Sequence, residues 1–291
     1  MKKAKIFALL SIMAAALLIA PLKMFADAAP GDVIVTLGQN LTDEQKNSLL
    51  KEMDVPADVQ TVTVKNEEEH KYLGDYISKA QIGSKAISSS KITVGEKDQG
   101  LSVETNNINW VTEEMYMNAL TTAGVTDAEI YVTAPFEVSG TAALTGILKA
   151  YETTAQIEIP EAQKQVANEE MVKTAELGER IGAKEATELM TRVKEEIAKN
   201  PVQSEDDLRA LIEKVAKDMG IELTEEELNG LIALFNKMKD LNIDWDQLQS
   251  DLKNISENLG DFLNKEETQS FIQKILEFLS ALIEAIKSLF K

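Results

Sequence analysis

The sequence contains no cysteine, one histidine (His70) and three arginines (Arg180, Arg192 and Arg209) among 291 residues. The lack of cysteine excludes disulfides, cysteine-ligated metals and cysteine nucleophiles, and a single histidine excludes every site that needs two. Acidic residues outnumber basic ones by 49 to 30, which gives a formal net charge of −19. Nucleic-acid-binding proteins need a basic face that neutralises phosphates, so we expect no nucleic-acid partner.

The first 28 residues have the layout of a secretory signal peptide. Three lysines lie within residues 2–5, an uncharged apolar run covers residues 6–20, and Ala26-Asp27-Ala28 matches a cleavage site that requires small side chains. The apolar run is short for a membrane-spanning helix, which needs about 20 residues, although an uncleaved anchor is the alternative. We predict cleavage after Ala28 and a secreted or extracytoplasmic protein, free or retained at the cell envelope.

Cleavage would make the protein more acidic. Removal of residues 1–28 takes away four lysines and one aspartate and leaves 26 basic and 48 acidic residues, a net charge of −22. Such a charge favours solubility outside the cell. It also predicts repulsion from anionic lipids, so we expect no membrane contact after cleavage.

Residues 29–155 predict an α+β domain with a mixed sheet. Short apolar or alternating runs typical of strands are interspersed with capped helix patterns, in the order βαβα, ββ and αβα. Thr42, in a capping box with Gln45, and Asn66 are the predicted N-caps of the first two helices. The expected strands cover residues 33–37, 59–64, 91–95, 101–105 and 128–133. The turn-like residues 96–100 predict a β-hairpin between the third and fourth of these strands.

Residues 156–291 predict an all-α helical bundle region. The first long helix has two candidate break points, Gly178 and Gly182. The predicted N-caps of the following three helices are Ser204, Thr224 and Asp244. Apolar residues recur at intervals of three and four in each of these helices, as the core of a bundle requires.

Residues 268–291, from Thr268 to Lys291, form the most apolar segment after the signal region. Their apolar residues recur at spacings of three and four and form a stripe broader than a coiled-coil seam. Charged residues within the segment make it a poor membrane span. We expect a long amphipathic helix at the centre of the bundle, with a partner-binding or self-associating helix as the alternative.

Three runs of the first domain resemble the YpuA-like family of secreted proteins of unknown function from Gram-positive bacteria. They are residues 61–73 (TVTVKNEEEHKYL), 82–90 (IGSKAISSS) and 106–151 (NNINWVTEEMYMNALTTAGVTDAEIYVTAPFEVSGTAALTGILKAY). The resemblance implies an extracytoplasmic protein in which this domain precedes a variable helical region. It implies no activity, ligand or catalytic residue.

Three short patterns that suggest chemistry are incomplete. The Glu67-x-x-His70 pair is half of a di-iron ligand set, and the second histidine is missing. Residues 88–91 (SSSK) match the S-x-x-K motif of penicillin-binding enzymes, but S-D-N and K-T-G do not occur in the sequence. The Asp244-x-Asp246 pair lacks the further oxygen ligand and the glycine of an EF-hand. We therefore predict neither a metal site nor a cofactor.

The remaining candidate is Ser139-Gly140-Thr141, which lies between a predicted strand and a predicted helix. Free backbone amides at a helix start, with a glycine that permits close approach, can bind a carboxylate or a phosphate. Small residues at a tight turn also serve packing, and that alternative stays open. These three residues are the predicted ligand-binding site, and no catalytic residue is assigned.

Since no catalytic set emerges, the leading hypothesis is a non-catalytic protein of the cell envelope. The α+β domain would then act as a binding or scaffold module of unknown ligand, and the helical region would mediate assembly or partner contact. One alternative is an envelope hydrolase that uses a pair of carboxylates and needs neither cysteine nor histidine. Another is a membrane-surface protein that acts through its amphipathic C-terminal helix.

Overall fold

The structure, a computed structural model, describes residues 29–56, 58–155, 158–241, 243–245, 247–248 and 252. The predicted signal peptide and residues 268–291 lie outside these ranges. So does most of the helix predicted to follow Asp244. Among the described helices, none is long and apolar enough to cross a membrane.

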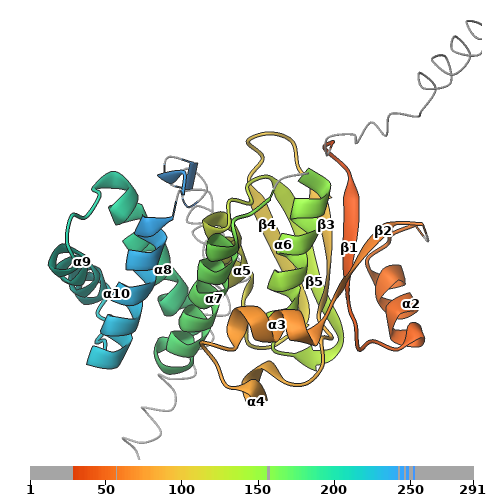
Figure 1. Ribbon diagram of the computed structural model, residues 1–291, viewed down its shortest axis with the longest axis horizontal. Coiled ribbons are helices and arrows are strands. Elements are labelled where there is room, and N and C mark those ends of the chain that lie inside the picture. Colours follow the sequence, from red (N-terminus) through yellow and green to blue (C-terminus); the bar gives the residue numbers. More distant parts are fainter. Residues whose placement is uncertain are drawn as a thin grey trace, which may run out of the picture.

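Five strands form one mixed sheet in the order β2-β1-β3-β5-β4 (Figure 1). They are β1 (Val33–Gly38), β2 (Gln60–Val64), β3 (Ser89–Val94), β4 (Leu101–Ile108) and β5 (Ala128–Val138). The pairs β1·β2 and β4·β5 are parallel, whereas the central strand β3 is antiparallel to both β1 and β5. Two β-α-β units therefore flank one central strand, which confirms the predicted α+β fold with a mixed sheet.

Nine helices occur among the described residues. Those of the first half are α2 (Asp43–Glu52), α3 (Asn66–Leu73), α4 (Lys79–Ile82), α5 (Glu113–Thr122) and α6 (Thr141–Ala155). They are followed by α7 (Glu161–Ile181), α8 (Ala183–Lys199), α9 (Glu205–Asp218) and α10 (Glu225–Asp240). The region after residue 158 is helical wherever the structure defines regular elements, as the apolar periodicity predicted.

The two faces of the sheet are covered unequally. On one face, Ile34, Ile130 and Val132 pack in a single core with side chains of α5, α6 and α7, and α6 lies in front of the sheet in Figure 1. On the other face, α2 packs onto Val35 and Leu37 in a smaller core. Because α2 has only ten residues, the ends of β3, β5 and β4 remote from it are covered by no described helix.

Helix boundaries follow capping signals in the sequence. Thr42 and Thr224 form capping boxes at the starts of α2 and α10, as their patterns predicted. The first long helix breaks at Gly182, whose φ of 104° is a backbone conformation that favours glycine. The N-cap of α3 is Lys65 rather than the predicted Asn66.

The predicted β-hairpin across residues 96–100 is wrong. Strand β5 lies between β3 and β4 and pairs with both of them. Strand β4 is instead parallel to β5 and joined to it through α5, as in a β-α-β crossover. The burial of the strands explains this order, because β4 alternates buried and exposed residues as an edge strand does, while the middle of β5 is mostly buried.

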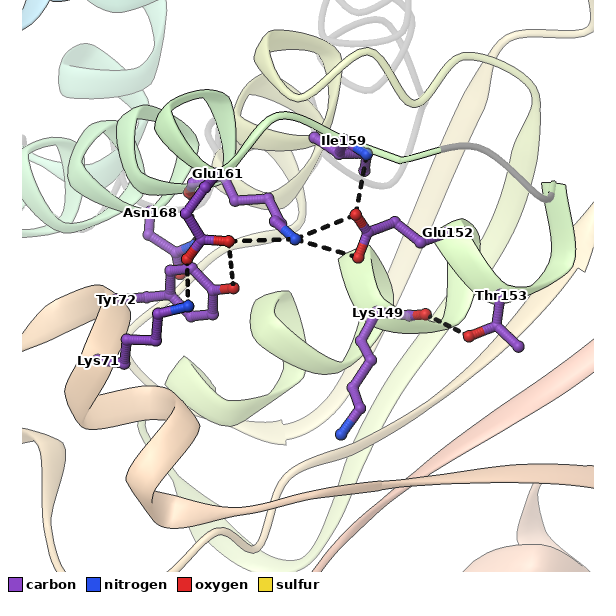
Figure 2. Close-up of polar contacts among 9 residues, drawn as sticks. Lys71, Tyr72, Lys149, Glu152, Thr153, Ile159, Glu161 and Asn168 are labelled. Carbon is purple, nitrogen blue, oxygen red and sulfur yellow. Dashed lines mark hydrogen bonds and ion pairs between the residues drawn. The ribbon is translucent and has the colours of Figure 1, made fainter.

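Helix α7 is attached to the first half of the chain by charged side chains (Figure 2). Glu161, at the start of α7, pairs with Lys71 of α3. Lys164 lies 3.0 Å from Glu152 of α6, and that same carboxylate accepts the backbone N–H of Ile159 at 2.8 Å. The network spans the place where the domain boundary is predicted, and the division at residue 155 stays a prediction.

A second, fully buried ion pair joins three helices. Lys194 Nζ of α8 lies 2.7 Å from Glu170 Oε1 of α7, and the two side chains are 0% and 1% exposed. Thr122 of α5 donates to Glu170 Oε2 at 2.5 Å, and Lys194 donates to the carbonyl of Asn118 at 3.1 Å. Burial lowers the pKa of Lys194, although the carboxylate of Glu170 favours its charged form.

Removal of one partner should show how strongly the fold depends on this pair. Lys194→Met leaves the Glu170 carboxylate buried without a counter-charge, and we expect the free energy of unfolding to fall by about 3–5 kcal/mol. Arg192→Met is the matched control, because Arg192 lies on the same helix and pairs with Glu188 at the surface; its loss should stay below about 1 kcal/mol. Urea denaturation measures both, and equal losses would contradict the assignment.

Candidate functional site

An open groove of 480 Å³ lies on the sheet face that α2 leaves partly uncovered. This volume is typical of sites that bind small ligands. The last turn of α2 and the residues after it form one wall, with Glu52, Met53 and Asp54. The polar floor consists of two rows across β3, β5 and β4, namely Lys91, Tyr131 and Glu104, followed by Thr93, Glu129 and Ser102.

Glu52 is held in one orientation by three hydrogen bonds to the same oxygen. Its Oε1 accepts from Thr133 Oγ1 at 2.7 Å, from Tyr131 Oη at 2.8 Å and from Asn106 Nδ2 at 3.0 Å. Burial tends to raise the pKa of Glu52, but these hydrogen bonds outweigh it and the pKa is lowered. The side chain is therefore a carboxylate at neutral pH, and its Oε2 accepts no hydrogen bond from the described residues.

The basic residue of the groove, Lys91, already has a hydrogen-bond acceptor within the protein. Lys91 donates from Nζ to the carbonyl oxygen of Met53 at 2.9 Å. This bond attaches β3 to the end of α2, where Asp54 adopts a positive φ of 49°. The ammonium is thus held at the wall of the groove rather than directed at its centre.

The predicted site Ser139-Gly140-Thr141 lies at the start of α6, away from the groove. The hydroxyls of Ser139 and Thr141 are 3.3 Å apart, and Thr141 donates to Oε2 of Glu69 at 3.1 Å. Gly140 has a φ of 95°, and its carbonyl accepts from Tyr116 Oη at 2.6 Å. A carboxyl group of the chain, that of Glu69, therefore already binds to this turn, while binding of an external anion there stays a prediction.

Glu69 is the most deeply buried carboxyl group near that turn. It is 1% exposed, and its other oxygen accepts from Asn66 Nδ2 at 3.3 Å. Burial raises the pKa of Glu69 to about 7, against the opposing effect of the hydrogen bonds from Asn66 and Thr141. The site can thus hold a neutral carboxylic acid at the junction of α3, α5 and α6.

The other sequence patterns occupy structural positions. Ser89 and Ser90 are completely buried at the start of β3, where Ser90 Oγ lies 2.7 Å from Thr36 Oγ1. Lys91 follows them in the strand but is bound to Met53, as described above. His70 Nε2 lies 3.0 Å from the carbonyl oxygen of Gly83. The described part of the chain contains no group of three or more acidic or histidine side chains suited to a metal ion.

Comparison with protein families matches residues 37–255 to the family described as "Protein of unknown function (DUF1002)". The chain belongs to this DUF1002 family. It is also 52% identical over 276 residues to the "Uncharacterized protein YpuA" of Bacillus subtilis (strain 168), a match that covers 94% of this chain and 95% of the relative. The resemblance to the YpuA-like family is thereby confirmed. No solved structure matches the chain.

The groove of this DUF1002 member was not predicted from the sequence. The available signal was the alternation within residues 101–105 and 128–133, which places Ser102, Glu104 and Glu129 on the face opposite the apolar residues. The wrong hairpin separated these acids from each other, since it paired β4 with β3. Only in the observed strand order does β5 lie between β3 and β4, which places Glu129 beside the residues of β4 and completes the floor of the groove.

The buried Glu69 predicts a pH-dependent stability. Its pKa is about 7 in the folded protein against an ordinary value of 4.5, so its contribution is fully present below about pH 4.5 and is lost as the pH rises toward 7. The loss is on the order of 3 kcal/mol. We expect Glu69→Gln, which stays neutral, to flatten the stability profile across this range.

Urea denaturation at pH 4.5, 5.5, 6.5 and 7.5 measures this profile. Glu67→Gln is the control, because Glu67 is an exposed acid on the same helix. A slope that is identical in the wild type and Glu69→Gln would show that Glu69 does not carry the dependence.

Proposed function

We propose that this protein is a secreted or envelope-associated binding module that holds its ligand in the groove formed by α2, β3, β5 and β4. The observation that carries the proposal is the groove itself, with a volume of 480 Å³ and a floor of side chains fixed on a sheet. The signal-peptide layout of residues 1–28 supports export. Self-association through residues 268–291, which lie outside the described part, belongs to the same proposal.

A carboxylate hydrolase is the second candidate, and the positions of Glu104 and Glu129 favour it. These residues lie one row apart on adjacent strands, so strand spacing and rise separate their Cα atoms by about 8 Å. Side chains that start about 8 Å apart on one sheet face can bring their carboxyl groups within the roughly 5–10 Å of a glycosidase pair. Such an enzyme also needs an acid with a raised pKa. The pKa of Glu52, the groove acid held by three hydrogen bonds, is lowered, so Glu52 is unsuited to that role and we favour binding.

The groove can be filled without disturbing the core. Ser102 is exposed in the outer strand β4, and Ser102→Trp should place an indole across the floor. We expect the exported protein to lose at least tenfold in its affinity for isolated cell envelopes, measured by cosedimentation. Ser48→Trp is the control, because Ser48 is exposed on α2 outside the groove.

Two outcomes would reject this assignment. If Ser102→Trp sediments with envelopes as the wild type does, the groove does not hold the ligand. If the wild type releases reducing ends from purified wall glycan, and Glu104→Gln or Glu129→Gln abolishes that release, the protein is a hydrolase rather than a binding module.

Export itself has a separate test. N-terminal sequencing of the protein recovered outside the membrane should begin at Ala29. Ala28→Leu replaces the small side chain that signal peptidase requires, so the precursor should accumulate in the membrane fraction. Recovery of the uncleaved wild-type chain in the cytosol would contradict export.

A further inference from the structure

The groove carries more negative charge than two other hollows of the described residues. Its lining contains four carboxylates and one ammonium. The hollow between α8 and α9, of 310 Å³, is lined by three acidic and two basic side chains. In the hollow of 210 Å³ between α7 and α10, Glu227 is already paired with Arg180. The groove is therefore the most acidic of these three hollows.

Two of the groove acids, Glu104 and Glu52, keep oxygens that can meet a ligand, whereas Glu129 accepts from Gln99 Nε2 at 3.0 Å. Lys91 forms no ion pair with the groove acids among the described contacts and donates instead to Met53. Glu104 accepts no hydrogen bond from the described residues, and Glu52 has only its Oε1 engaged. Carboxylate oxygens of Glu104 and Glu52 that can accept hydrogen bonds thus lie on both sides of Tyr131. The ring of Tyr131 forms part of the floor, on the strand between β3 and β4.

Charge complementarity then defines the ligand class. A metal ion needs several oxygen ligands that converge, and no such group exists among the described residues. An ammonium group can instead bind one or two carboxylates and lie over an aromatic ring. The hydroxyls of Ser102 and Thr93 at the next row can bind polar groups beside it.

We propose that the groove binds a short peptide segment that carries a primary ammonium group, such as a lysine side chain. The ammonium lies over Tyr131 between Glu104 and Glu52, and the adjoining backbone follows the row of Thr93, Glu129 and Ser102. This inference rests on the proposed function, because it names the ligand of the same groove. A volume of 480 Å³ lies within the range of pockets that bind small ligands, so the segment is short.

The test uses the exported chain, residues 29–291, and the tripeptide Ala-Lys-Ala with an acetylated N-terminus and an amidated C-terminus. Isothermal titration calorimetry should show saturable binding that weakens at least threefold between 50 and 500 mM salt, since screening reduces charge attraction. The same tripeptide with an acetylated lysine side chain has no ammonium. Its affinity should be at least tenfold lower.

The variants locate the interaction. Glu104→Gln should weaken binding of the tripeptide about threefold to tenfold, as the loss of one partly solvated charge contact does. Glu104→Asp should keep most of the affinity. Glu137→Gln removes an equal charge from an exposed position of β5 outside the groove, and we expect it to bind as the wild type does.

The outcomes separate this inference from the proposed function. If a neutral trimer of N-acetylglucosamine binds, Ser102→Trp blocks it and the lysine tripeptide does not bind, the ammonium specificity is wrong while the groove keeps its binding role. If Glu137→Gln weakens the tripeptide as much as Glu104→Gln does, the attraction comes from the general charge and the inference is overturned. If no probe binds and Ser102→Trp leaves envelope binding unchanged, both proposals fail.

Discussion

Burial of one sheet face beneath α5, α6 and α7 is the constraint from which the other features follow. Ile130 and Val132 of β5 belong to that core together with Leu144 of α6 and Met171 of α7. Because Leu101 and Val103 of β4 and Ile130 and Val132 of β5 point to this side, the alternate residues of these strands must point to the other side. There the ten-residue helix α2 covers only part of the sheet, so a polar floor is left open as a groove.

Two buried carboxyl groups show how the protein accommodates acidic side chains inside that packing. Glu170 is matched by Lys194 at 2.7 Å, so the two charges compensate each other across α7 and α8. Among the described residues Glu69 accepts hydrogen bonds from Asn66 and Thr141, and burial raises its pKa in spite of them. The first arrangement specifies how helices pack, whereas the second makes one junction sensitive to protonation.

The sequence predicted what is encoded locally and missed what depends on distant pairing. The capping box of Thr42 and the helix break are read from a few neighbouring residues; the capping box is confirmed, and of the two candidate break points the helix ends at Gly182 and continues through Gly178. The order of the strands depends on which apolar surfaces are buried together, so the hairpin across residues 96–100 was wrong. For the same reason the partnership of Glu69 with Thr141, 72 positions away, could not be derived from the turn itself.

Hydrogen bonds within the protein fix part of the groove before any ligand binds. The three donors that hold Glu52 come from β4 and β5, and they fix the end of α2 above the floor. Lys91 of β3 makes a second attachment to the same end of the helix through Met53. A ligand would therefore meet a Glu52 carboxylate whose position is already set, and little ordering entropy of that side chain opposes its binding. The hydrogen bonds that hold α2 over one part of the sheet face thus also determine which acidic side chains stay exposed on the neighbouring part.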